Sequence, residues 1–226
     1  AGGPPSARSR LASRTTVATA SPSIPLLELF RPPLLRTTAL GILIGAIPLL
    51  GAWASSKWML PWADHVAGPG NPGYKAIVLL CWSTGATIGG LTGGYVGQLL
   101  GRRLSYTLIS LCACGMNLFI YELLEPLEAA FLPAVFVQGV ISTMFFGWLP
   151  LYLPEIFPTR VRATGTGISY NFGRFLTAGG VMAAGLLIQF FNGEYARVGA
   201  VTGLVYALGA VVILWAPETK GKDLQG

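Results

Sequence analysis

The sequence predicts an all-α membrane protein with one domain of six transmembrane helices. The first observation is composition: of 226 residues, 53% are hydrophobic and only 11% are charged, whereas a soluble domain carries about 25% charged residues. The second is a mean hydropathy of +0.61. The third is the spacing of the charges, because six stretches of 18 to 26 consecutive residues lack Lys, Arg, Asp and Glu. Together they exclude a disordered protein, a coiled coil and an ordinary water-soluble enzyme.

Each charge-free stretch can supply one helix that crosses the hydrocarbon core, which takes about 20 mostly apolar residues. A helix suits lipid because it satisfies its own backbone hydrogen bonds. We therefore expect six spans, at residues 37–56, 76–100, 104–122, 129–153, 165–191 and 197–216. They form a six-helix transmembrane domain over residues 31–226.

The first thirty residues differ from the rest of the chain. Residues 1–23 are rich in Ser, Thr, Pro and Ala and contain Arg8, Arg10 and Arg14 but no acid. We expect a flexible cytoplasmic linker over residues 1–30. A transit peptide is the alternative that this composition leaves open.

The basic residues divide unequally between the two sides of the membrane. Twelve of the fifteen lie on the side that holds both termini, and Lys57, Lys75 and Arg197 lie on the other. Because cytoplasmic loops carry the excess of Lys and Arg, both termini are expected in the cytoplasm. We expect a multi-pass protein of the plasma (inner) membrane. This orientation accounts for the net charge of +6, so no nucleic acid partner is expected.

A stripe of glycines runs along the second expected span. Gly85, Gly89, Gly93, Gly97 and Gly101 recur every four residues, which keeps them near one helix face. Small residues at this spacing let another helix backbone approach closely. The stripe predicts a tight helix pair, which either packs statically or allows one helix to slide on the other.

Catalytic patterns are missing from the sequence. The one histidine, His65, falls in a Pro- and Gly-rich loop expected over residues 57–75. The sequence has no G-x-S-x-G elbow, no H-E-x-x-H pair and no phosphate-binding G-x-x-x-x-G-K-[ST] loop. We therefore expect neither an enzyme nor a cofactor or metal site.

Three polar runs lie at the expected cytoplasmic helix ends, at residues 94–103, 154–167 and 217–221. In each run a charged residue meets a turn. Glu155 follows a helix whose carbonyl end would repel a carboxylate. It therefore needs a basic partner, and the candidates are Arg160, Arg162, Arg102 and Arg103.

The three runs resemble motifs of the major facilitator superfamily, especially its sugar-porter and metabolite–proton symporter branches. Residues 94–103 are similar to G-x-x-x-D-[RK]-x-G-R-R, with Gln98 and Leu99 at the acidic and basic positions. Residues 154–167 are similar to P-E-x-F-P-x-x-x-R-x-x-G-x-G, and residues 217–221 to P-E-T-K-G. The resemblance implies a cytoplasmic gate. Its motif residues are Gly94, Gly101, Arg102, Arg103, Glu155, Arg160, Arg162 and Glu218.

The resemblance further implies the C-terminal half of a twelve-helix fold, with an N-terminal six-helix half as partner. Such a protein moves a small organic solute, a sugar or organic acid, by secondary active or facilitative transport with alternating access. The alternative is a non-transporting membrane sensor or a truncated remnant of a transporter. Protons are a possible coupling ion. No Asp or Glu lies mid-span, so a coupling carboxylate is expected in the other half.

Candidate cavity residues are polar or aromatic side chains away from the helix ends: Gln138, Trp148, Tyr170, Asn171 and Arg174, with Asn117 as a further possibility. Arg174 leaves three interpretations open. Nine residues into a helix from Gly165 it would lie about 13 Å deep and could bind an anionic substrate. Alternatively the membrane span starts at Arg174, since residues 175–193 already number 19, and the guanidinium reaches the cytoplasmic interface. The third interpretation is that Arg174 belongs to a structural pair within the membrane.

Overall fold

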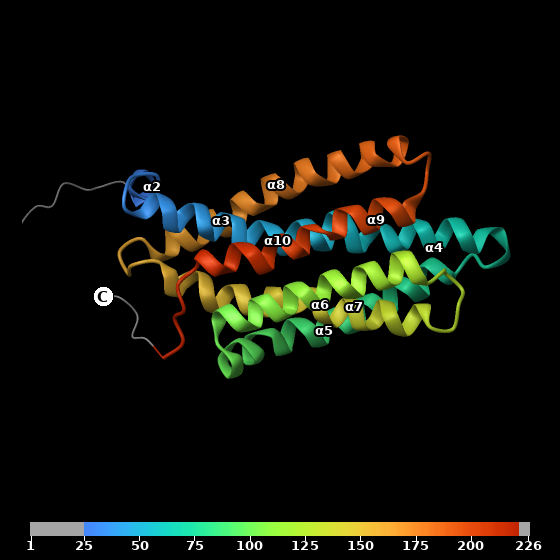
Figure 1. Cartoon of the computed structure of the whole chain (residues 1–226), viewed down its shortest axis with the longest axis horizontal. Coiled ribbons are helices and arrows are strands. Elements are labelled where there is room, and N and C mark those ends of the chain that lie inside the picture. The colour runs from blue at the N-terminus through green and yellow to red at the C-terminus, as the bar shows by residue number, and fades with distance from the viewer. Residues whose placement is uncertain (1–24, 222–226) are drawn as a thin grey trace, which may run out of the picture.

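The computed structural model describes residues 25–221, which form an elongated helical bundle (Figure 1). The helices are α2 (Pro25–Leu29), α3 (Leu34–Leu50), α4 (Met59–Ala67), α5 (Tyr74–Leu100), α6 (Arg102–Leu123), α7 (Phe131–Tyr152), α8 (Arg162–Phe190), α9 (Tyr195–Gly203) and α10 (Val205–Val212). Short π- and 3-10-helical turns extend several of them. Six helical stretches are long and apolar enough to cross a membrane, which confirms the predicted fold class. They are Leu34–Gly70, Tyr74–Leu100, Arg102–Leu123, Phe131–Ile156, Arg162–Phe190 and Tyr195–Trp215.

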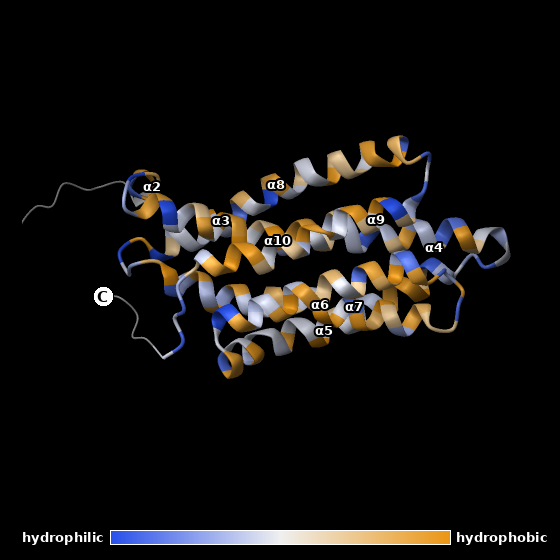
Figure 2. Cartoon of the chain, viewed as in Figure 1, coloured by the Kyte–Doolittle hydropathy of each residue, from blue (hydrophilic) through white to orange (hydrophobic). Residues whose placement is uncertain are grey.

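The six spans place both described ends of the chain at one end of the bundle, here called the terminal end (Figure 1). The terminal end also holds the α5–α6 turn and the segment between α7 and α8. The opposite end holds α4 and the loops that precede α7 and α9. Between these two ends, the helices consist mainly of hydrophobic residues (Figure 2). Of the expected linker over residues 1–30, residues 1–24 lie outside the described part of the chain, and 25–29 form α2.

Pro48 interrupts the hydrogen bonds of α3. It has no N–H to donate to the carbonyl four residues earlier, at Ile44. The Tyr106 hydroxyl replaces the missing donor and donates a hydrogen bond to the Ile44 carbonyl oxygen at 2.8 Å. Both residues are fully buried. The bond therefore ties α6 to α3 at the point where the proline weakens α3.

We expect Tyr106→Phe to lower the free energy of unfolding by about 1–3 kcal/mol, because it leaves a buried carbonyl without a donor. Denaturation in mixed micelles measures the change. Tyr95→Phe, which removes a hydroxyl from a residue that is 64% exposed, is the matched control and should leave stability unchanged. Equal stability of the two variants would show that the Tyr106 bond contributes nothing.

The expectation of a loop over residues 57–75 is wrong. The first span passes through π-helical Gly51–Ser55 and 3-10 Ser56–Trp58 into α4, so helical structure continues to Gly70. Pro61 is tolerated because it lies in the first turn of α4, where an N–H has no helical partner. His65 consequently lies on a helix at the opposite end.

The last span is interrupted rather than continuous, since α9 ends at Gly203 and α10 begins at Val205. Just before the break, the Gly199 carbonyl oxygen accepts hydrogen bonds from the Ser55 hydroxyl at 2.8 Å and the Asn117 amide at 3.0 Å. Side chains that insert into a helix ladder in this way bend it.

The glycine stripe makes the close helix contact that the sequence predicts, and the structure identifies α7 as the partner of α5. A Cβ added to Gly85, Gly89 or Gly93 would overlap the carbonyl oxygen of Phe136, Val140 or Met144, respectively. On the facing helix, a Cβ on Gly147 would overlap the Gly90 carbonyl oxygen. The two backbones therefore touch over about three turns.

Two helices present most of their surface outside the bundle. Only 17% of the apolar window of α8 and 22% of that of α5 are buried, against 50% for the spans that contain α3, α6 and α7. Large apolar side chains on these helices are exposed, among them Leu91 on α5 and Phe175 and Met182 on α8. These surfaces face either lipid or another helical domain.

Candidate functional site

A cavity of about 920 Å3 lies between the first span, α5, α7 and α8. Two of its lining residues, Lys57 and Arg174, are charged, and both are basic. Four are aromatic: Trp53, Trp82, Phe146 and Tyr170. None of the described lining residues carries a carboxylate or a carboxamide.

Arg174 lies in the middle of α8, twelve residues after the helix begins at Arg162. The helix therefore begins well before Arg174, in the helical stretch Arg162–Phe190 that is long and apolar enough to cross a membrane. The guanidinium carbon lies 5.1 Å from the centre of the Tyr170 ring, one turn earlier on the same helix. The Arg174 side chain forms no ion pair or hydrogen bond with the described residues. It is thus a cation of the cavity wall held against an aromatic face.

Lys57 is a cavity residue that the sequence analysis missed. Its ammonium lies 3.7 Å from the centre of the Trp82 ring and 5.8 Å from that of Trp53. The 20 uncharged residues before Lys57 are already enough for one membrane span, so the sequence predicts that the helix ends there. Trp53, four residues earlier and thus on the same helical face, was the available indication that the helix continues through Lys57.

Of the predicted cavity residues, Tyr170 and Arg174 line this cavity, and Gln138, Trp148 and Asn171 do not. Trp148 is fully buried between Tyr106 and Tyr152, with ring centres 4.8 and 4.6 Å away. Asn171 is exposed and donates to the carbonyl of Gly167, one turn back.

Gln138 belongs to a buried polar network inside the bundle. Its amide nitrogen lies 3.4 Å from the Ser56 hydroxyl and 3.5 Å from the Asn117 carbonyl oxygen. The Ser55 hydroxyl is 3.0 Å from the same Asn117 oxygen. Polar groups of the first span, α6 and α7 thus contact one another inside the bundle, while the buried Gln138 Oε1 has no hydrogen-bond partner among the described residues.

The terminal end carries a charge cluster that contains two of the predicted gate residues, Arg102 and Glu155. Arg102 holds Glu155 through two hydrogen bonds, from Nε at 2.9 Å and from an η nitrogen at 2.6 Å. The Thr219 hydroxyl lies 2.5 Å from the same carboxylate. The two charged side chains are only 10% and 15% exposed. Among the candidate partners of Glu155, the structure therefore selects Arg102, which links the start of α6 to the end of the fourth span.

Glu218 fastens the C-terminal segment to the start of α6. Its carboxylate accepts backbone N–H bonds from Arg102 and Arg103, both at 3.0 Å, and from Thr219 and Lys220. Gly101, with φ at +92°, makes the turn that aims the first two donors. Burial raises the pKa of Glu218, but the four N–H donors outweigh it, and the pKa lies below its ordinary value.

A lowered pKa means that the Glu218 contacts stabilise the fold above the unfolded-state pKa and are lost as pH falls through the folded value. We expect wild type to unfold at a higher temperature than Glu218→Gln at pH 7. The difference should shrink below about pH 4. Glu125→Gln, at an exposed position of the opposite end, is the control. A difference that is independent of pH would contradict the assignment.

The remaining gate residues have other partners. Arg160 pairs with Glu28 of α2 at 2.5 Å. Arg162 donates from Nε to the carbonyl oxygens of Pro154 at 2.9 Å and Phe157 at 3.3 Å. Gly94 lies against α7, where an added Cβ would be 3.0 Å from the Gly147 carbonyl oxygen.

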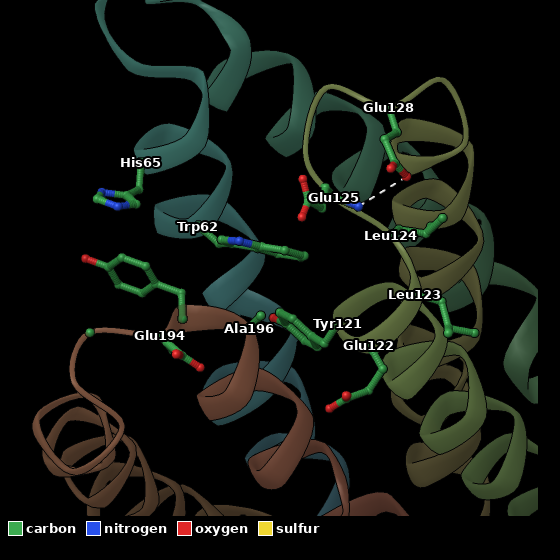
Figure 3. Close-up of a pocket in the computed structure, with 12 residues that line it drawn as sticks. Trp62, His65, Tyr121, Glu122, Leu123, Leu124, Glu125, Glu128, Glu194 and Ala196 are labelled. Carbon is green, nitrogen blue, oxygen red and sulfur yellow. Dashed lines mark hydrogen bonds between the residues drawn. The ribbon is translucent and has the colours of Figure 1, made fainter.

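A second hollow, of about 550 Å3, lies at the opposite end (Figure 3). Trp62 and His65 reach it from α4, and Glu122, Glu125 and Glu194 come from two loops and the end of α6. His65 also lies beside Tyr195, with ring centres 5.7 Å apart. The described residues contain no group of three or more His, Cys, Asp or Glu that could hold a metal.

Comparison with known proteins connects these features to solute transport. The sequence pattern of the family described as "Sugar (and other) transporter" matches residues 20–226. A probable 4-methylmuconolactone transporter of Cupriavidus pinatubonensis is 26% identical over 204 residues, which are 89% of this chain and 46% of that protein. The sialic acid transporter NanX of Escherichia coli is 28% identical over 196 residues, 83% of this chain and 45% of that protein.

A cis,cis-muconate transport protein of Acinetobacter baylyi is 28% identical over 153 residues, 62% of this chain and 36% of that protein. This chain therefore spans less than half the length of these relatives. The family match covers most of the chain and confirms the resemblance carried by the three polar runs. The chain is an integral, multi-pass membrane protein that belongs to the sugar (and other) transporter family of the major facilitator superfamily.

Proposed function

We propose that the chain is the C-terminal half of a twelve-helix transporter that moves a small organic solute by alternating access. The observation that carries the proposal is the cavity between the first span, α5, α7 and α8. Polar groups at membrane depth are tolerated where they meet water or a partner, and they mark solute pathways. In the proposal, a first six-helix half covers the sparsely buried faces of α5 and α8 and supplies the other cavity wall.

The Arg102–Glu155–Thr219 cluster is proposed to close the terminal end when the cavity opens at the opposite end. The cluster joins the α5–α6 turn, the end of the fourth span and the C-terminal segment of this half, so it would hold these helix ends in the arrangement that closes the terminal end. The binding free energy of the solute then differs between the two states and drives the exchange.

The transport test compares solute uptake into liposomes by the full-length protein and by residues 1–226 alone. We expect saturable uptake from the first and none from the second, since one half encloses no cavity between halves. Saturable uptake by the isolated chain as a monomer would overturn the assignment as a half.

We further propose that both termini are cytoplasmic in the plasma (inner) membrane, from the excess of basic residues at the terminal end. In a variant without native cysteines, Cys at Pro69 should react with an impermeant reagent from outside, and Cys at Gln225 should not. Pro69 is exposed at the opposite end, and Gln225 lies outside the described residues. Reversed labelling would invert the orientation.

Proton coupling, where it exists, is proposed to use a carboxylate of the other half. The acidic residues within the described part of the chain lie near helix ends, in loops or in the C-terminal segment: Glu28, Asp64, Glu122, Glu125, Glu128, Glu155, Glu194 and Glu218. None lies mid-span, where proton relays are found.

A further inference from the structure

We propose that the cavity selects a planar organic carboxylate, with Arg174 and Lys57 as its two recognition cations. The inference rests on the proposed transport function, because it names the class of solute that this cavity would take. The inference favours an organic anion over a neutral sugar as the solute. Three features of the cavity wall carry it.

The first feature is positive charge that none of the described residues of this chain compensates. Arg174 and Lys57 line one cavity, and no acidic residue lines it with them. Neither forms an ion pair with the described residues, and each lies against aromatic rings instead. A basic side chain in the middle of a membrane span costs at least about 2.5–3.5 kcal/mol. A bound carboxylate would offset that cost for both cations at once.

The second feature is the availability of the Arg174 donors. The guanidinium has five N–H groups in a planar fork that matches a carboxylate. Tyr170 contacts it through a ring face, and an aromatic face positions a cation without providing the counter-charge of a carboxylate. The donors therefore remain available for a solute.

The third feature is the small number of lining groups suited to a neutral sugar. Apart from the threonines, the uncharged lining residues with a polar side-chain group are Tyr170, Trp53 and Trp82. A sugar presents many hydroxyls, which require buried donors and acceptors in return. The two hydroxyls of the lining threonines are already engaged, Thr143 with the carbonyls of Ala86 and Gly139 and Thr177 with that of Gly173. The remaining wall contains Trp53, Trp82 and Phe146, whose flat faces suit a planar unsaturated body.

The binding test uses full-length protein in nanodiscs and measures affinity by titration calorimetry. Benzoate and benzamide are the probes, because they share a shape and differ in charge, and glucose is the neutral sugar. We expect benzoate to bind at least about tenfold more tightly than benzamide or glucose, which corresponds to one charge-assisted hydrogen bond.

The variants assign the two cations. Arg174→Gln and Lys57→Gln should each weaken benzoate binding about 10- to 100-fold and leave benzamide unchanged. Arg174→Lys keeps the charge but loses the fork, so its affinity should lie between wild type and Arg174→Gln. Arg197→Gln and Lys75→Gln remove the same charges at exposed positions of the opposite end and should bind as wild type does.

Uptake assays separate this inference from the proposed function. Benzoate binding that depends on Arg174 and Lys57 without uptake of any solute would support the anion site and overturn transport. Uptake of glucose without preference for benzoate, unchanged in Arg174→Gln, would overturn the anion site and leave transport standing. Absence of both binding and uptake would overturn the anion site and the transport function. An equal loss of benzoate affinity in the control variants would show that the effect depends on overall charge, and would overturn the anion site.

Discussion

Gly93→Ala is expected to destabilise the bundle by about 3 kcal/mol, at the upper end of the range for overpacked cores. The added methyl would overlap the Met144 carbonyl oxygen, with the Met144 carbonyl carbon and Cα within 3 Å as well. Backbone atoms cannot rotate away as a side chain can, so α5 and α7 must separate. Because these two helices touch along much of their length, the separation would loosen contacts beyond Gly93 itself. Mixed-micelle denaturation and the yield of monodisperse protein measure the effect.

Gly90→Ala is the matched control for this prediction. Gly90 lies on the same helix, three residues away, yet a Cβ added there meets no atom within 4 Å. The same substitution should be neutral or stabilise by up to about 1 kcal/mol through helix propensity. If Gly93→Ala and Gly90→Ala behave alike, the α5–α7 contact is looser than the structure shows. Sliding of the two helices, the alternative left open by the sequence, would then be the better interpretation.

Glu155→Gln is expected to shift the full-length protein towards the state open at the terminal end and to change turnover more than affinity. The reason is the bidentate bond from Arg102, which loses its charge complement in the variant. From sequence alone, an exposed pair would contribute only about 0–1 kcal/mol. Since both side chains are largely buried, we expect a coupling free energy of about 2–3 kcal/mol in a double-mutant cycle with Arg102→Gln.

The exposed pair Lys75–Asp64 provides the control cycle. Its side chains are 50% and 53% exposed at an N–O distance of 3.1 Å, so its coupling should stay below about 1 kcal/mol. Accessibility is measured by labelling a cysteine placed at the terminal end in an otherwise cysteine-free variant. Unchanged accessibility and turnover in Glu155→Gln, with equal coupling in both cycles, would remove the gate role of this cluster.

The number and order of the spans follow from sequence because lipid imposes a local rule. A span needs about 20 consecutive, mostly apolar residues, and such a stretch can be recognised in the sequence alone. The contact face of α5 was also predictable, since residues four apart share a helix face, but its partner α7 was not. The same rule failed at residues 57–75, where the helix continues beyond the minimal span length and carries Lys57 with it.

The membership of the charge cluster was only partly predictable. The motifs pointed to Glu155, Arg102 and Glu218, but four arginines were equally suitable as partners of Glu155. The choice of Arg102 depends on where the turn at Gly101 brings α6 relative to the fourth span. Glu28, the partner of Arg160, comes from residues that were expected to form a linker.

By itself, the sequence determined six spans, their order, the close-packing glycine face of α5 and the family motifs, because each depends on residues close together in the chain. Only the tertiary structure decided which polar residues share a space. Gln138 and Arg174 are both polar residues within spans, yet the Gln138 amide nitrogen contacts Ser56 and Asn117 inside the bundle, while Arg174 lies in the wall of the cavity with Lys57. The physical reason is that the rotation of each helix about its axis, together with packing, brings together residues more than a hundred positions apart. No local sequence pattern specifies that rotation.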